Sequence, residues 1–87
     1  MKWTIDYSGR AGKFIKKHGL GETIRSLLKD LILRIHGKPI NLDLKKLKGQ
    51  WTGYLRIRSG DIRIILKVYK KEKRLYVDKV DVRGNVY

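Results

Sequence analysis

Residues 54–69, YLRIRSGDIRIILKVY, decide the fold, because apolar and polar side chains alternate on both sides of a central Ser-Gly-Asp. A period of two that is interrupted by glycine is typical of a β-hairpin with one buried face. If the turn is centred on Ser59 and Gly60, the cross-strand pairs follow by counting outward from it. The predicted pairs are Ile57 with Ile62 and Leu55 with Ile64 on the buried face, and Arg56 with Arg63 on the opposite face.

Three arginines on the outer face of this hairpin oppose its folding, since like charges that face each other across a sheet repel. They are Arg56, Arg58 and Arg63, and Asp61 is a candidate ion-pair partner for Arg58 at the hairpin end. A solvated outer face explains them. A phosphate clamp explains them equally well, because a guanidinium binds phosphate through two parallel hydrogen bonds and stays charged at any working pH.

The periodicity of the remaining sequence predicts two helices and two more strands. Alternation over residues 3–7 predicts a first strand, and apolar residues at helical spacing predict a short helix that ends before Gly19. A longer helix over about residues 22–36 carries a wide apolar stripe, which packs on a sheet or on a partner. Residues 37–49 are expected to form a basic connection with one irregular turn, and residues 75–82 a last strand.

The order β-α-α-β-β-β predicts a single α+β domain over residues 1–87. Its consecutive strands are expected to form an antiparallel sheet with both helices packed on one face, which leaves the opposite face for function. The alternation of the last strand breaks at Asp78 and Lys79, and this break predicts a β-bulge.

The chain carries 22 Lys and Arg against 8 Asp and Glu, which gives a formal net charge of +14. The basic residues are spread from Lys2 to Arg83, so the charge belongs to the folded body. Such a charge indicates a polyanionic partner, nucleic acid first, with an anionic membrane surface or an acidic protein as weaker alternatives. Lys45, Lys46 and Lys48 are either solvated or follow a nucleic-acid backbone without reading its sequence.

Several classes of function are disfavoured by what the sequence lacks. It has no cysteine, which excludes disulfides and thiolate chemistry. The start MKWTIDYSGR has no apolar core of a signal peptide, and no apolar run reaches the length of a membrane span, so we expect a cytoplasmic protein. His18 and His36 lack acidic neighbours at ligand spacing and the acids are scattered, so we expect neither a metal site nor a two-metal nuclease.

The second half of the chain carries a set of motifs at fixed spacing. It contains LKGQWTGYLRIRSGDIRIILKVY over residues 47–69 and RLYVDKVDVRGNVY over residues 74–87. A Leu-x-Gly, a strand ending in arginine, a Gly-Asp-x-Arg turn and a final arginine followed by Val-Tyr together resemble the RelE branch of the RelE/ParE toxin superfamily. The first half agrees with this branch in the order and length of its elements.

The resemblance implies the RelE-like α+β fold and the toxin of a toxin–antitoxin pair. Toxins of this branch are endoribonucleases that cleave mRNA in the ribosomal decoding site by attack of the ribose 2′-hydroxyl, with neither metal nor cofactor. The implied partners are a cognate antitoxin and the ribosome with its mRNA and rRNA, without membrane contact. Two alternatives remain open: a ParE-like inhibitor of a target such as gyrase, and a basic RNA- or ribosome-binding module that cuts nothing.

The resemblance also assigns roles to individual residues. Arg63 would stabilise the transition-state phosphate, Arg83 would neutralise or protonate the leaving oxygen, and Tyr87 would act on the 2′-hydroxyl or stack near the base. Arg56 stands where some relatives have lysine, and arginine is too basic to exchange a proton readily, so charge stabilisation and orientation are its expected role. Tyr54 is expected to hydrogen bond or stack. Further RNA or ribosome contacts are expected from Arg58, Lys45, Lys46 and Lys48.

Overall fold

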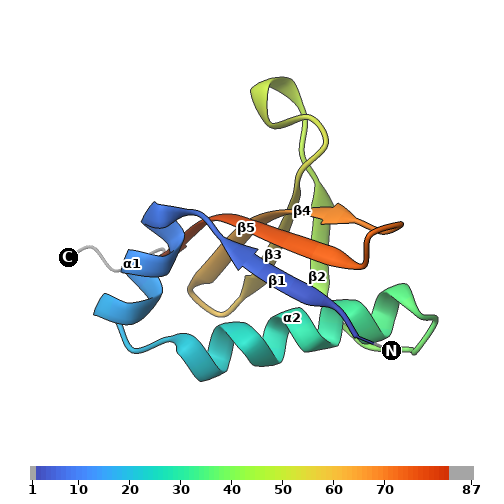
Figure 1. Cartoon of the computed structure of the whole chain (residues 1–87), viewed down its shortest axis with the longest axis horizontal. Coiled ribbons are helices and arrows are strands. Elements are labelled where there is room, and N and C mark those ends of the chain that lie inside the picture. The colour runs from blue at the N-terminus through green and yellow to red at the C-terminus, as the bar shows by residue number, and fades with distance from the viewer. Residues whose placement is uncertain (1, 83–87) are drawn as a thin grey trace.

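The helices and strands of the computed structural model follow the predicted order, with two additions in the basic connection (Figure 1). The structure describes residues 2–82. The elements are β1 (Thr4–Tyr7), α1 (Gly9–Lys17), α2 (Gly21–Ile35), β2 (Asp43–Lys46), the 3-10 helix η1 (Gly49–Trp51), β3 (Leu55–Ser59), β4 (Ile62–Tyr69) and β5 (Arg74–Val82). The additions are β2 and η1, where the sequence predicts only an irregular turn.

The five strands form one sheet in the order β1-β5-β4-β3-β2. The predicted antiparallel meander of β3, β4 and β5 is confirmed, but β1 lies parallel to β5, with Ile5 beside Leu75. The expectation of a purely antiparallel sheet is therefore wrong at this edge. Side-chain alternation predicts which face of a strand is buried, whereas the direction of the strand depends on how the helices return the chain to the sheet.

Strand β2 is an edge strand that the sequence pattern does not predict. It pairs antiparallel with β3, so that Leu44 lies opposite Ile57 and Lys45 lies opposite Arg56. Lysine and aspartate are depleted in strands, so the charged residues of β2 predict a connection and not a strand. The same charged side chains protect a short exposed edge against pairing with another chain.

The hairpin turn is formed by Gly60 and Asp61, one residue later than predicted, because Ser59 pairs with Ile62. Gly60 has a φ of 58°, which suits the first central position of a type II′ turn and is unfavourable for a side chain. The predicted pairs are therefore wrong, but the predicted faces are correct, since the partner moves by two residues. The observed pairs are Ile57 with Ile64, Leu55 with Leu66, Arg56 with Ile65 and Arg58 with Arg63.

The predicted bulge in β5 is confirmed, and it anchors the first helix. Ile65 pairs with Lys79 and Leu66 with Val77, so that Asp78 is the extra residue. Ser8 is the N-cap of α1. Its hydroxyl donates to the freed Asp78 carbonyl at 2.6 Å and accepts a hydrogen bond from the Ala11 amide. The Asp78 carboxylate accepts from Arg10 at 2.7 Å. The bulge thus fixes the start of α1 against β5.

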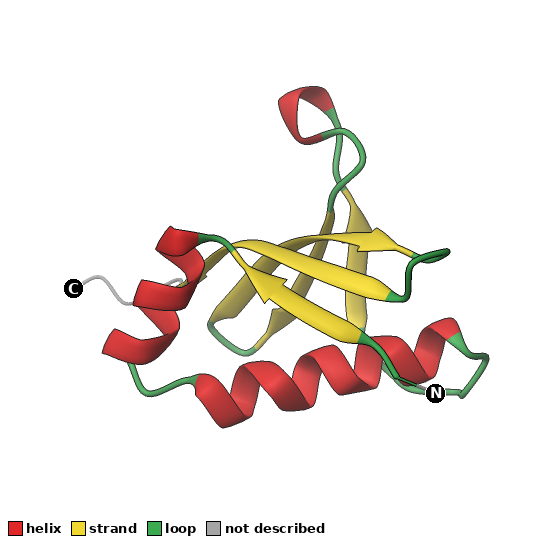
Figure 2. Cartoon of the chain, viewed as in Figure 1, coloured by secondary structure: helices red, strands yellow, loops and turns green. Residues whose placement is uncertain are grey.

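The apolar core lies between the sheet and the helices, which cover one of its faces (Figure 2). Helix α2 contributes three fully buried side chains, at the helical spacing that the sequence predicts. The buried core residues are Ala11, Ile24, Leu28, Leu31, Ile57, Ile64, Leu66, Leu75, Val77 and Val80. The opposite face of the sheet is free of helices, and the loop that carries η1 projects beside it (Figure 1).

Within residues 2–82, neither helix combines the length and the apolar character that crossing a membrane requires.

Candidate nucleic-acid interface

The free face of the sheet contains a hollow of about 320 Å³ between the η1 loop and strands β3, β4 and β5. Alternate side chains of these strands line the hollow. The residues next to them in sequence, Ile57, Ile64 and Val80, point to the other face and into the core. The lining residues are Leu47, Trp51, Arg56, Arg63, Ile65, Lys79 and Asp81. Two of the four residues to which the sequence assigns catalytic roles, Arg56 and Arg63, therefore share one cavity.

Arg63 is held by Asp81, its direct partner across β4 and β5. Its Nε donates to Oδ1 at 3.0 Å and its Nη2 donates to Oδ2 at 3.3 Å. The two side chains are 39% and 26% exposed, so the pair is partly shielded from water. Lys79 places its Nζ 4.0 Å from the same carboxylate. The cationic group that would face a phosphate is thus oriented before any ligand binds.

Arg56 and Arg58 share a carboxylate from the edge strand β2. Arg56 Nη2 donates to Asp43 Oδ1 at 3.1 Å, and Arg58 Nε lies 4.0 Å from Asp43 Oδ2. The expected ion pair of Arg58 with Asp61 is wrong, because Asp61 lies in the turn and Asp43 lies opposite Arg58. Among residues 2–82, Arg56 Nε is the buried side-chain donor that lacks a hydrogen-bond partner.

The like-charge contact predicted for Arg56 and Arg63 falls instead on Arg58 and Arg63, which face each other across β3 and β4. Such a pair destabilises a sheet. Here each guanidinium lies near a carboxylate of the strand on its outer side, Asp43 on β2 or Asp81 on β5. These carboxylates offset the repulsion and leave both arginines on the free face.

Aromatic side chains form one border of the hollow. Trp51 lines it and meets Tyr54 in an edge-to-face contact with ring centroids 5.3 Å apart. Tyr54 itself lines an adjoining cavity, and Lys67 Nζ lies 5.6 Å from its ring centroid. The alternation and helical spacing of the sequence do not place Trp51 in this hollow. The available signal was Gly49 and Gly53, whose φ values of 70° and 95° let η1 project from the sheet.

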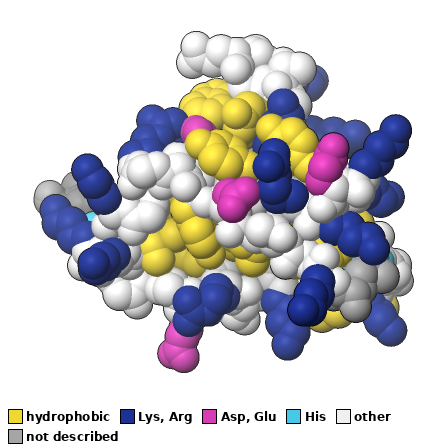
Figure 3. All heavy atoms as spheres, viewed as in Figure 1, with side chains coloured by type: hydrophobic (Ala, Val, Ile, Leu, Met, Phe, Trp, Pro, Cys, Tyr) yellow, Lys and Arg dark blue, Asp and Glu magenta, His cyan; other side chains and the backbone are white. Residues whose placement is uncertain are grey.

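The lysines of the basic connection continue the cationic surface beyond the hollow. Lys45, Lys46 and Lys48 are exposed and line a shallow cavity with Leu47. Lys45 lies directly opposite Arg56, on the same face of the sheet. Figure 3 shows Lys and Arg side chains spread over the visible surface and few acidic ones between them.

Two of the predicted site residues, Arg83 and Tyr87, lie outside the described residues. In sequence, Arg83 directly follows β5, the strand that carries Asp81 into the hollow. Their roles remain predictions.

The two histidines lie at helix ends, and each contacts an aromatic side chain. His18 packs on Phe14 with ring centroids 4.2 Å apart, and His36 Nε2 accepts a hydrogen bond from Trp3 Nε1 at 3.1 Å. No group of three or more His, Cys, Asp or Glu that could hold a metal ion occurs within residues 2–82.

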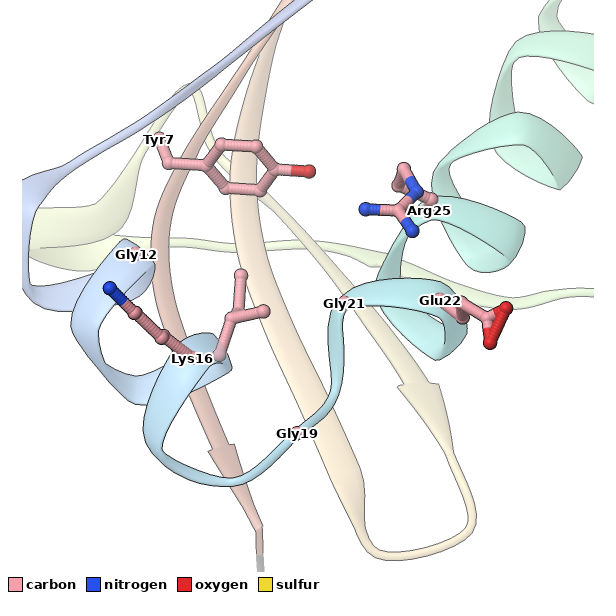
Figure 4. A pocket seen from close by; sticks show the side chains of 8 residues that line it. Tyr7, Gly12, Lys16, Gly19, Gly21, Glu22 and Arg25 are labelled. Atoms are coloured by element: carbon pink, nitrogen blue, oxygen red, sulfur yellow. The ribbon is translucent and has the colours of Figure 1, made fainter.

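A second hollow, of about 480 Å³, lies on the helical side of the molecule where β1 ends beside α1 and α2 (Figure 4). Tyr7 and Arg25 face each other across it. Burial raises the pKa of the Tyr7 phenol, and the charge of Arg25 opposes this rise. Neither side chain has a hydrogen bond or an ion pair to any part of the described chain. Nothing in the sequence pattern predicts this hollow.

The order of the elements, the mixed sheet and the arginine-lined face define an α+β protein of the RelE-like fold. Comparison with solved structures confirms the fold that the sequence predicts. YafQ from E. coli superimposes with a TM-score of 0.64 at 23% identity, over 99% of each chain. The toxin–antitoxin complex RelBE2 from Mycobacterium tuberculosis matches with a TM-score of 0.69 at 19% identity, over 95% of this chain and 100% of the other.

An archaeal RelE–RelB complex from Pyrococcus horikoshii OT3 matches with a TM-score of 0.61 at 24% identity, over 99% of this chain and 100% of the other. No family model matches the sequence, and no curated protein matches it. At these identities the likeness establishes the fold, and the function has to be argued from the site.

Proposed function

We propose that this protein is the toxin of a toxin–antitoxin pair and that it cleaves mRNA in the decoding site of the ribosome without a metal ion. The observation that carries the proposal is the convergence of Arg56 and Arg63 in one hollow on the free face of a RelE-like fold. The net charge of +14 gives the protein an electrostatic preference for a polyanion such as RNA.

The chemistry requires no group beyond the RNA and the side chains. The ribose 2′-oxygen forms a bond to the adjacent phosphorus as it gives up its proton, and the bond from phosphorus to the 5′-oxygen breaks as that oxygen takes up a proton. Negative charge develops on the phosphate oxygens between these events. Arg63 and Arg56 stabilise this charge through hydrogen bonds donated from fixed positions.

The proton transfers are assigned to the end of the chain, on the resemblance described above. Tyr87 acts on the 2′-hydroxyl or stacks near the base, and Arg83 neutralises or protonates the leaving oxygen. A tyrosine can act as a base only when nearby positive charge lowers its pKa, and arginines are abundant on this face. Arg56 remains charged throughout, so it orients the phosphate and does not remove the proton.

RNA contacts outside the reacting phosphate use the border of the hollow. The ring of Trp51 lines the cavity and that of Tyr54 adjoins it, which supports stacking of bases next to the cleaved bond. Arg58 and the lysines of β2 and its connection to η1 are exposed, which suits contacts with the phosphates of mRNA or rRNA.

The proposed partner is a small antitoxin with an acidic or amphipathic segment that neutralises the basic surface. Complexes named RelBE2, RelE–RelB and DinJ–YafQ are among the similar structures, which supports a partner of this kind. The proposed place of action is the cytoplasm, where ribosomes translate.

Binding without cleavage is the second candidate function. The ion pairs of Arg56 and Arg63 favour it, because a carboxylate already accepts hydrogen bonds from some of the N–H donors of each guanidinium. In that case the arginines would position an RNA backbone, or the surface would dock on another target such as gyrase.

Primer extension on ribosomes programmed with a defined mRNA tests the proposal. Wild-type protein should produce cuts inside the decoding-site codon, and these cuts should be absent from ribosome-free RNA and from an Arg63→Ala, Tyr87→Phe double variant. Arg25→Ala is the matched control, because it removes one arginine from the other side of the molecule. A folded wild-type protein that makes no cuts would contradict the proposal, and a supercoiling assay with gyrase would then test the inhibitor alternative.

A further inference from the structure

The contact between Arg63 and Asp81 uses one particular edge of the guanidinium. A guanidinium has five N–H donors in a rigid planar fork. Asp81 accepts from Nε at 3.0 Å and from one hydrogen of Nη2 at 3.3 Å, which together form the side edge of that fork. No other hydrogen bond to the Arg63 side chain occurs among the described residues. The end of the fork, made by Nη1 and the second hydrogen of Nη2, is left for a ligand.

We propose that Asp81 is a positioning residue, which fixes Arg63 by its side edge so that the end of the guanidinium meets the oxygens of the phosphate being cleaved. This inference rests on the proposed function. Arg63 and Asp81 both line the hollow, so the constrained group borders the space that the phosphate would occupy. A phosphate can then take two parallel hydrogen bonds from a group that is already oriented.

The position of Asp81 suits this role better than that of Asp43, the carboxylate that contacts Arg56. Asp81 lies directly opposite Arg63 on adjacent antiparallel strands and makes two hydrogen bonds to it. Asp43 makes one hydrogen bond to Arg56 from an edge strand, and its side chain is 54% exposed. Water and salt screen such an exposed contact. Asp81 therefore constrains Arg63 more firmly than Asp43 constrains Arg56.

A positioning role predicts opposite effects on binding and on catalysis. The carboxylate lowers the positive potential of the hollow and repels the RNA phosphates, so its removal should leave binding unchanged or tighten it. The same removal frees Arg63 to adopt other rotamers, and a displacement of about 1 Å of a catalytic group can cost about 100-fold in rate. We therefore expect kcat to fall while KM is constant or lower.

The test is cleavage of ribosome-bound mRNA by three variants. Asp81→Asn should lower kcat by about 10- to 100-fold without raising KM, and Asp81→Glu, which keeps the charge, should recover part of kcat. Asp78→Asn is the matched control, since it removes another arginine–aspartate pair of β5 that lies outside the hollow. The inference is overturned if Asp81→Asn cleaves like wild type, or if its losses match those of Asp78→Asn.

A second measurement does not depend on cleavage. In ¹H–¹⁵N NMR spectra of the free protein, the Nε–Hε group of Arg63 should give a shifted and slowly exchanging signal, because its hydrogen is donated to Asp81. Asp81→Asn should abolish that shift. A wild type that cleaves nothing defeats the proposed function, whereas an identical Arg63 signal in wild type and Asp81→Asn defeats the positioning role by itself.

Discussion

On the free face of the sheet, Arg56 and Arg63 each lie against a carboxylate of a neighbouring strand, whereas Arg25, in the hollow beside the helices, has no such partner among the described residues. The helical hollow is the larger of the two, at about 480 Å³ against about 320 Å³. Cavity size alone would therefore favour the hollow beside the helices as the site. The smaller hollow has convergent, oriented charges, and these are what phosphate chemistry requires.

The difference follows from the elements that carry the arginines. Arg63 lies on β4 between two hydrogen-bonded neighbours, so the strand register fixes both Arg58 and Asp81 beside it. Arg25 projects from α2 into the other hollow toward Tyr7, and no carboxylate pairs with it among the described residues. The strand register thus orients Arg63 before a ligand binds, and no comparable contact orients Arg25 within residues 2–82.

The largest expected effect comes from exchanging an arginine for lysine in each hollow. Arg63→Lys keeps the charge but loses the planar fork, so it can bind neither Asp81 nor a phosphate through two parallel hydrogen bonds. We expect its cleavage rate on programmed ribosomes to fall about 100-fold or more. Arg25→Lys should cleave within about 2-fold of wild type, since only surface charge is replaced by equal charge. Equal losses in both variants would contradict the distinction.

Removal of the Trp51 ring should have a smaller effect, on binding rather than on chemistry. Stacking of a base on an aromatic side chain contributes about 1–3 kcal/mol. Trp51→Ala should therefore weaken binding of a short oligoribonucleotide by about 10-fold, and Trp51→Phe should restore part of it. Fluorescence anisotropy at fixed salt measures both. Unchanged affinity in Trp51→Ala would remove Trp51 from the interface.

The smallest expected effect is the pH dependence of the helical hollow. Burial favours the neutral phenol of Tyr7, so its pKa in the folded chain is raised above the ordinary value of about 10. The unfolded chain then loses its proton first as pH rises. Folding stability linked to Tyr7 is complete below about pH 10 and declines as pH rises from there through the raised pKa.

Absorbance at 295 nm follows this titration. Tyr7→Phe should remove this raised tyrosine titration, and Arg25→Ala should raise the pKa of Tyr7 further, because the opposing charge is lost. A lower pKa of Tyr7 in Arg25→Ala would show that the two groups do not interact as the structure indicates.

Periodicity predicts much of the fold because burial is a local property of the sequence. The core stripe of α2, the two faces of the hairpin and the bulge at Asp78 all follow from alternation or helical spacing. The strand β2 escapes prediction because its charged residues resemble a loop. The direction of β1 is not predictable from the sequence pattern, because side-chain alternation is the same in parallel and antiparallel strands.

The candidate site is predictable in its arginines but not in its carboxylates. Arg56 and Arg63 stand out as charges at strand positions on a face that the sequence leaves uncovered. Asp43 and Asp81 come from different strands at the two sides of the hairpin, and their contacts depend on the β2–β3 and β4–β5 registers, which the alternation within the hairpin does not define. Trp51 could have been found from Gly49 and Gly53, which allow its loop to leave the sheet.

The proposed function requires that the hollow lined by Arg56 and Arg63 acts on RNA and that the hollow lined by Tyr7 and Arg25 does not. The most direct measurement compares single-turnover cleavage of ribosome-bound mRNA by Arg63→Ala and Arg25→Ala, with folding of both confirmed by thermal unfolding. We predict a loss of about 100- to 1,000-fold for Arg63→Ala and a rate near wild type for Arg25→Ala. Cleavage by Arg63→Ala at the wild-type rate would contradict the claim.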